Sequence, residues 1–227
     1  MRFAWIEESP FNVAGAGGVP VGCDVALARH AFTLLGKAFE PVQADFAYLL
    51  PGLSDGRWDV TTGMFVTQER SLRASFTRPI WTLRDGLLVR RADADRLTGY
   101  RQLAESGARV AVLEGQVQHR TALALGVRQE SIVVFKSYAE AAAALSEGRV
   151  AAYSSVELAH RRWVETHDEL VCVAVPDSEK TPEAGGFACA TPALRDRLDT
   201  VLARFIGSPD HARLLRAEGV DPASLGF

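Results

Sequence analysis

The chain has 227 residues, of which 48% are hydrophobic and 23% are charged, so it is long enough for one large domain or two small lobes. Its net charge of -3, with no run of Lys or Arg, argues against a general nucleic-acid or membrane-surface binder. No apolar stretch approaches the length of a membrane span.

The three cysteines are Cys23, Cys172 and Cys189, and their spacing fits no metal site. We expect buried free thiols, although a bridge between Cys172 and Cys189 stays open. Residues 2–6 already form a predicted strand, with no signal-peptide pattern before them. Either a signal peptide has been removed or the protein is cytosolic.

The first predicted strand, residues 2–6, is followed by a loop that contains Glu8 and Phe11. Loops at the carboxyl ends of such strands bind ligands in open α/β sheets. A helix is expected from Asp24, as its N-cap, to Gly36, followed by a strand over residues 39–44. The next helix begins near Phe46 and Tyr48, which are either core residues or part of a binding site.

Residues 56–70 predict a strand that stops at Gly63 and continues through Phe65 to a short helix capped by Thr67. The first turn of that helix carries Arg70. A cation there is disfavoured by roughly 0.3–1 kcal/mol unless an anion is bound. We interpret Thr67, Arg70 and the free N–H groups as a carboxylate or phosphate site. The alternative is that Arg70 pairs with a neighbouring acid and extends into solvent.

The second half of the chain repeats the alternation of strands and helices. A turn with Gly115 and Gln118 follows a predicted strand, and Ser137 caps an alanine-rich helix. Residues 170–175 predict a buried parallel strand, residues 176–186 a linker, and Pro192 the start of the final long helix. The remaining predicted strands of this half cover residues 109–113, 132–135 and 150–153.

This alternation predicts an α/β fold of two similar lobes, each with a mostly parallel sheet and covering helices. Two hinge strands would join the lobes. The crossings are placed after residue 90 and at residue 187. Residues 1–90 with 187–227 form lobe one, and residues 91–186 form lobe two.

The stretch over residues 56–70, followed by Phe76-Thr77-Arg78-Pro79-Ile80-Trp81, resembles the first-lobe signature of the amino-acid-type (family 3) extracellular solute-binding proteins of ABC importers. The resemblance implies the type II periplasmic binding protein fold, a ligand in the cleft between lobes that close by hinge motion, and a membrane permease as partner. It also implies an extracytoplasmic monomer without catalytic activity, cofactor, metal or nucleic-acid partner. The implied ligand-binding residues are Glu8, Phe11, Phe46, Gly63, Phe65, Thr67, Arg70, Gln118 and Ser155.

Two departures from the family pattern bear on the ligand. Val156 stands where members usually carry the carboxylate that holds an amino acid's ammonium, although a shift of one residue would let Glu157 serve. Phe65 stands where Ser or Thr is common. With Glu8 and Phe11, it resembles the ectoine-binding branch, whose ligand carries a delocalised cation suited to aromatic faces. The alternative is that Phe65 packs near the hinge and the ligand is an ordinary amino acid.

Two other functions are compatible with the same fold. Cyclohexadienyl dehydratase-like enzymes resemble these binding proteins and need a positioned acid, for which Glu8 or Glu157 could serve. A cytosolic ligand-sensing module is the third alternative, favoured if the native protein has no signal peptide.

Overall fold

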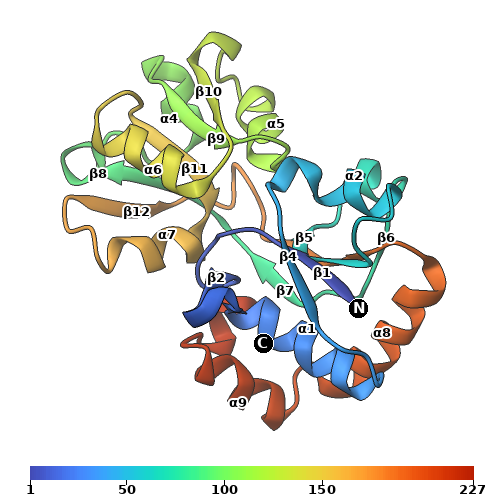
Figure 1. The fold of residues 1–227 in the computed structure, drawn as a ribbon. Helices are drawn as coiled ribbons and strands as arrows, with labels where there is room; N and C mark the ends of the chain where they lie inside the picture. The colour runs from blue at the N-terminus through green and yellow to red at the C-terminus, as the bar shows by residue number, and fades with distance from the viewer. The chain divides into compact units, whose positions relative to one another are not determined.

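The computed structural model describes residues 1–227, and the chain divides into two compact units. Unit 1 contains Met1–Thr82 and Glu183–Phe227, and unit 2 contains Leu83–Pro182. Each unit has a β-sheet with helices against it (Figure 1), so the predicted α/β class is confirmed. Both crossings lie earlier in the chain than predicted, because strand β8, Asp85–Arg90, pairs with strands of unit 2 and strand β13, Glu183–Cys189, pairs with strands of unit 1.

Unit 1 begins with a strand and ends with two helices. Its strands are β1 (Arg2–Trp5), β2 (Val13–Ala14), β3 (Pro20–Val21), β4 (Glu40–Gln43), β5 (Val60–Phe65), β6 (Ser75–Phe76), β7 (Trp81–Leu83, which extends into unit 2) and β13 (Glu183–Cys189). Its helices are α1 (Cys23–Leu34), α2 (Leu49–Ser54), α3 (Gln68–Ser71), α8 (Pro192–Phe205) and α9 (Pro209–Ala217), with short 3-10 turns at Ala16–Gly18, Phe46–Tyr48 and Pro222–Leu225.

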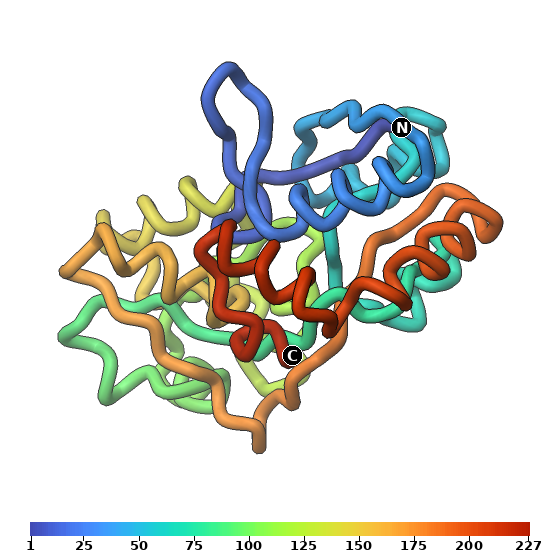
Figure 2. The backbone as a smooth tube through the Cα atoms, turned by 90° about the horizontal axis from the view of Figure 1, so that it is seen from below, coloured from blue at the N-terminus to red at the C-terminus, as the bar shows by residue number.

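The main sheet of unit 1 has the order β4-β1-β5-β13-β6, with β7 also paired to β13. Strand β1 is parallel to β4 and β5, whereas β13 runs antiparallel to β5 and β6. Helix α1 packs against α8 and α9. Figure 2 shows the hairpin of β2 and β3 as a narrow loop beside α1. The carboxyl ends of β4, β1 and β5 therefore share one edge of the sheet.

Helix α1 begins two residues earlier than predicted. Gly22 is its N-cap, so the prediction that Asp24 caps this helix was wrong. Asp24 lies instead in the first turn, where its side chain is buried against β5. The predicted end is confirmed, because Gly36 adopts a positive φ of 65° directly after the C-cap residue Leu35.

Unit 2 alternates strands and helices. Its strands are β8 (Asp85–Arg90), β9 (Val110–Leu113), β10 (Ile132–Phe135), β11 (Ala152–Val156) and β12 (Leu170–Ala174). Its helices are α4 (Tyr100–Ser106), α5 (Val117–Ala124), α6 (Tyr138–Ser146) and α7 (Glu157–Val164), with 3-10 turns at Arg91–Asp93 and Gln129–Ser131. Ser137 accepts a hydrogen bond from the Glu140 backbone N–H, so the predicted cap of α6 is confirmed.

The sheet of unit 2 has the order β10-β9-β11-β8-β12. Strands β10, β9 and β11 are parallel, whereas β8 is antiparallel to both β11 and β12. The prediction of a buried parallel strand over residues 170–175 was wrong, because β12 is an antiparallel edge strand with partly exposed side chains. An uninterrupted apolar run does not distinguish these two kinds of strand.

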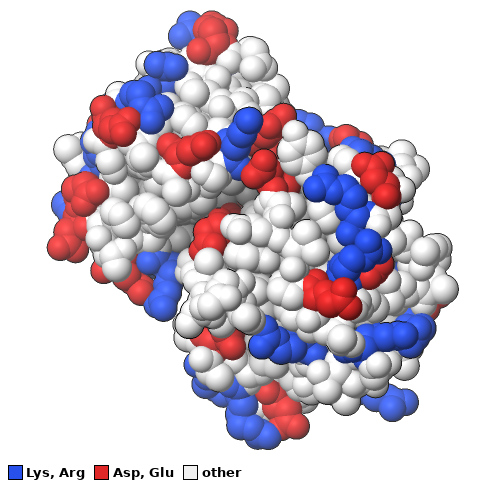
Figure 3. Space-filling model, in the orientation of Figure 1, with Lys and Arg blue, Asp and Glu red and all other residues white.

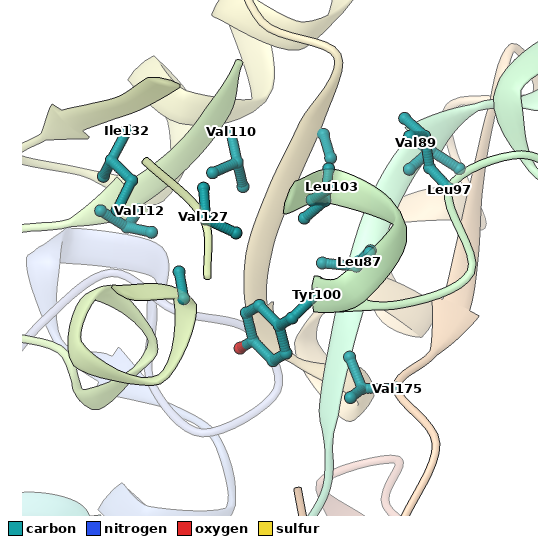
Figure 4. Packing of buried hydrophobic residues seen from close by; sticks show 12 residues of the cluster. Leu87, Val89, Leu97, Tyr100, Leu103, Val110, Val112, Val127, Ile132 and Val175 are labelled. Carbon is teal, nitrogen blue, oxygen red and sulfur yellow. The ribbon is translucent and has the colours of Figure 1, made fainter. Parts of the chain in front are cut away.

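Each unit has a core of its own. In unit 2, side chains from α4, α5 and the sheet pack together, among them Leu87, Tyr100, Leu103 and Val110 (Figure 4). In unit 1, Trp58 is fully buried against α2 and donates a hydrogen bond to the Leu49 carbonyl over 2.8 Å. Burial of such a large ring makes this part of the core sensitive to small changes in volume.

We expect Gly52→Ala to lower the free energy of unfolding by about 1–3 kcal/mol, because an added Cβ would overlap the Trp58 ring. Urea denaturation of the variant measures this loss. Ser54→Ala is the control, since Ser54 lies on the same helix with its side chain exposed. Equal stability of the two variants would contradict close packing between Gly52 and Trp58.

No helix of the structure is long and apolar enough to cross a membrane. No group of three or more His, Cys, Asp or Glu side chains is arranged to hold a metal ion. The three cysteines are free thiols, which leaves no bridge between Cys172 and Cys189. Basic and acidic side chains are interspersed on the face drawn in Figure 3, as expected from a nearly balanced charge composition.

Candidate functional site

The predicted site residues of unit 1 follow the carboxyl ends of three neighbouring parallel strands. Phe11 comes after β1, Phe46 after β4, and Thr67 and Arg70 after β5. Because these strand ends share one edge, the fold brings together residues that are distant in sequence. Contacts within unit 1 connect most of them.

An aromatic group forms at this edge. The Trp81 ring lies 5.2 Å from the Phe65 ring in an edge-to-face arrangement and 6.0 Å from the Phe11 ring, measured between centroids. An added Cβ on Gly185 would overlap the Trp81 ring, so the indole packs directly on the backbone of β13. Trp81 belongs to the motif over residues 76–81 but was not predicted as a site residue. Its place beside a strand start, two residues after Pro79, was the available signal.

Arg70 is 6% exposed and lies on α3, where Thr67 is the N-cap as predicted. Its Nη1 donates a hydrogen bond to the Phe65 carbonyl over 2.8 Å, and its guanidinium carbon is 5.3 Å from the centroid of the Phe46 ring. The alternative of an arginine extended into solvent is wrong, because the side chain is buried. Arg70 thus connects the end of β5 to the turn that follows β4.

The loop after β1 is a tight turn that positions Phe11. The Glu8 carbonyl accepts hydrogen bonds from the backbone N–H groups of Phe11 and Asn12, each over 3.0 Å. Phe11 is 5% exposed and Asn12 is 1% exposed. Glu8 therefore shapes the loop through its backbone, while the aromatic ring of Phe11 is directed into the structure.

Gly63 lies on β5 beside a buried carboxylate. Its backbone N–H donates to Oδ2 of Asp24 over 2.8 Å, and the Thr62 hydroxyl donates to the same oxygen over 2.8 Å. Burial raises the pKa of Asp24 to about 6, and the donors Thr62, Gly63 and Trp81 partly offset this rise. The expected strand end at Gly63 was wrong, since β5 continues to Phe65.

In unit 2, a buried polar group surrounds Asp85 at the start of β8. The Tyr100 hydroxyl donates to Oδ2 over 2.7 Å, Nε2 of Gln118 donates to Oδ1 over 2.8 Å, and Nζ of Lys180 lies 3.6 Å from Oδ2. The Tyr100 hydroxyl is also 2.7 Å from the Ser154 hydroxyl. Burial and the neighbouring Asp85 raise the pKa of Tyr100. Asp85, Tyr100 and Lys180 were missed because they are far apart in sequence.

The predicted site residues of unit 2, Gln118 and Ser155, lie near the carboxyl ends of β9 and β11 in the sheet of unit 2. Gln118 is 2% exposed and holds Asp85, and Ser155 donates a long hydrogen bond of 3.4 Å to Oε1 of Gln116. Val156 is the direct cross-strand partner of Asp85. Glu157 begins α7 and forms an ion pair of 2.5 Å with Arg161, one turn later. The carboxylate that faces Val156 is therefore that of Asp85, on the neighbouring strand β8.

The chain is similar to known binding proteins over nearly its whole length. The family model of the bacterial extracellular solute-binding proteins, family 3, matches residues 2–217. A probable amino-acid ABC transporter periplasmic-binding protein, y4tE, of Sinorhizobium fredii is 27% identical over 236 residues, which cover 99% of this chain and 78% of the relative.

Two solved structures share the fold. EhuB in complex with hydroxyectoine has a TM-score of 0.88 and 24% identity, and the match covers 100% of this chain and 91% of EhuB. AbpA from Streptococcus pneumoniae bound to L-arginine has a TM-score of 0.88 and 23% identity, with 99% of this chain and 95% of AbpA covered.

Proposed function

Since the chain belongs to the bacterial extracellular solute-binding proteins of family 3, we propose that it binds a small zwitterionic solute and delivers it to an ABC importer. The solute is an amino acid or an amino-acid derivative. The S. fredii relative is named as an amino-acid transporter component, which supports this class. The observation that carries the proposal is the buried Arg70 beside the aromatic group of unit 1.

The chemistry of this group suits a zwitterion. A guanidinium binds a carboxylate through paired hydrogen bonds, and here Arg70 is buried beside Phe46 and Phe65. Aromatic faces attract a cation by about 0.5–2 kcal/mol each when water is removed. Thr67 and Gly63 lie beside these groups on the same chain segment. A ligand with a carboxylate and a cation would therefore find a partner for each charge.

The nature of the cation follows from unit 2. Val156 places an apolar side chain where family members usually carry an acid, and Asp85 already has Tyr100, Gln118 and Lys180 around it. A primary ammonium is strongly hydrated and needs a carboxylate when buried. A delocalised or alkylated cation is less hydrated and gains more from aromatic faces. We therefore place ectoine-like ligands ahead of simple amino acids.

The other parts of the proposal rest on the family. The partner is the membrane permease of an ABC transporter, the protein acts as a monomer outside the cytoplasm, and it binds its ligand without transforming it. The names of the relatives support the permease and the compartment.

A thermal-shift panel tests the ligand class. It contains hydroxyectoine, ectoine, betaines, L-arginine, polar amino acids, prephenate and arogenate. A ligand at a hundred times its dissociation constant adds about 2.7 kcal/mol to stability, so a true ligand gives a clear rise in Tm. We expect the largest rise with the ectoine and betaine group.

Two outcomes would contradict parts of the proposal. A rise with polar amino acids alone would remove the role of the aromatic group as a cation site. If the protein converts prephenate or arogenate in an absorbance assay, it is an enzyme of the dehydratase type. Trp81→Leu should abolish the response to the ectoine group, and Trp163→Leu is the matched control because Trp163 lies in unit 2 on α7.

A further inference from the structure

The buried carboxylate of Asp24 joins three segments of unit 1. Asp24 is 2% exposed, and its Oδ2 accepts the Thr62 hydroxyl and the Gly63 backbone N–H, each over 2.8 Å. A Cβ on Gly63 would come within 2.9 Å of this oxygen and within 2.7 Å of Nε1 of Trp81. Helix α1, strand β5 and the start of β7 therefore meet at Gly63, where there is no room for a larger side chain.

The same group reaches the loop after β1. Nδ2 of Asn12 donates to the Thr62 hydroxyl oxygen over 2.8 Å, and this hydroxyl has a second acceptor, Oδ1 of Asn12, at 3.1 Å. Asn12 follows Phe11 directly, and Phe11 contacts Trp81. A single carboxylate is thus linked by hydrogen bonds to the segments that carry Phe65 and Phe11, and the indole of Trp81 also acts on it.

No cation acts on this carboxylate. The groups that affect it are the hydroxyl of Thr62, the amide of Gly63 and the indole of Trp81. The titratable groups around it are the thiol of Cys23, its neighbour on α1, and Glu218, which the fold brings to the start of α1, where it accepts a hydrogen bond from the Gly22 N–H over 2.9 Å. An ionised carboxylate buried without a cation is costly, so near neutral pH the charge of Asp24 lowers the stability of unit 1.

We propose that Asp24 is a positioning residue of the binding site: its carboxylate holds Gly63 and Thr62, and thereby fixes Trp81, Phe65 and Phe11 in the arrangement that receives the ligand. The inference rests on the proposed function. When Asp24 takes up a proton, it becomes a donor, and the Thr62 hydroxyl turns to Oδ1 of Asn12. Ligand binding and proton release are then linked, so affinity falls as the pH falls through the titration of Asp24.

Nuclear magnetic resonance of the isotope-labelled full chain without ligand tests the positioning. Between about pH 4.5 and 8, the carboxyl signal of Asp24, the amide signal of Gly63 and the indole signal of Trp81 should titrate together with a midpoint about 6. In Asp24→Asn, which keeps an oxygen acceptor but has no titrating proton, the Gly63 and Trp81 signals should stay constant. Titration of the Asp24 carboxyl with unmoved Gly63 and Trp81 signals would overturn the proposal.

Binding measurements complete the test, with hydroxyectoine and L-arginine as the probes. With a pKa of about 6, about a tenth of Asp24 is ionised at pH 5, so the wild-type dissociation constant should rise about tenfold from pH 7.5 to pH 5, whereas that of Asp24→Asn should not change. Asp59→Asn is the matched control, because Asp59 precedes β5 at its other end and pairs with Arg2 over 2.8 Å. An equal pH dependence in Asp24→Asn would overturn the proposal. Binding of neither probe would count against the ligand class, while the resonance experiment still decides the role of Asp24.

Discussion

Replacing Arg70 by alanine should weaken the binding of a zwitterionic ligand by roughly 2–5 kcal/mol, which is about thirtyfold to several thousandfold in affinity. The loss is large because Arg70 is 6% exposed, and a carboxylate bound beside it would be left without its counter-charge in a site shielded from water. Faster dissociation should account for most of the change. Calorimetric titration with the strongest ligand of the thermal-shift panel measures it.

Arg70 also supports the protein itself, so the binding effect must be separated from folding. Its hydrogen bond to the Phe65 carbonyl is lost in the variant, and we expect a lower Tm without ligand. Arg70→Lys keeps a charge but not the planar fork, and should recover only part of the affinity. Arg73→Ala is the matched control, since Arg73 is exposed one turn later. A loss below tenfold in Arg70→Ala with normal folding would exclude Arg70 as the carboxylate ligand.

Local patterns predicted the parts of the site that depend on neighbouring residues. The Thr67 cap and the placement of Arg70 after β5 follow from a stretch of a few residues, and both appear in the structure. Sequence alone could not show that Asp24 contacts β5, because its position suits an N-cap equally well. Packing of α1 on the sheet, a tertiary effect, determines that Asp24 binds the Gly63 N–H of β5 and does not cap the helix.

Pairing between distant strands explains the other differences. Asp85 and Val156 face each other only because β8 runs antiparallel to β11, a register that no local pattern encodes. The same pairing moves the first crossing to a point before Asp85 and makes β12 an edge strand. The sequence therefore predicted the class of each unit, whereas the contacts that organise Asp85 and Trp81 required the assembled sheets.

Acid should destabilise unit 2 through His160. This side chain is fully buried on α7, and its Nδ1 lies 2.6 Å from the Tyr138 hydroxyl. Burial lowers the pKa of His160 from 6.5 to about 3, although backbone groups of Tyr153 and Gly86 oppose this. Between these two pH values the unfolded chain binds a proton that the folded state does not. Stability is therefore lost as the pH falls from 6.5 to 3, by about 3 kcal/mol at pH 4.5.

Asp24 in unit 1 acts in the opposite direction. Because burial raises its pKa from 3.8 to about 6, the folded state holds a proton in that range that the unfolded chain does not. Stability is thus lost as the pH rises from 3.8 to 6, and regained, by about 2 kcal/mol, on acidification from neutral pH to 4.5. A measurement of global unfolding would partly hide both effects, because the loss of stability from His160 and the gain from Asp24 have opposite signs. Measurements that report on each unit separately should reveal them.

Hydrogen exchange followed by mass spectrometry, at about pH 7.5 and 4.5 with rates corrected for pH, resolves the units. Peptides from residues 83–182 should lose protection on acidification in the wild type, and lose about 3 kcal/mol less in His160→Asn, which keeps an acceptor for Tyr138 but does not titrate. His167→Asn is the control, because it removes a partly exposed imidazole stacked on Trp163. The same loss of protection in His160→Asn as in the wild type would show that another group causes the acid sensitivity of unit 2.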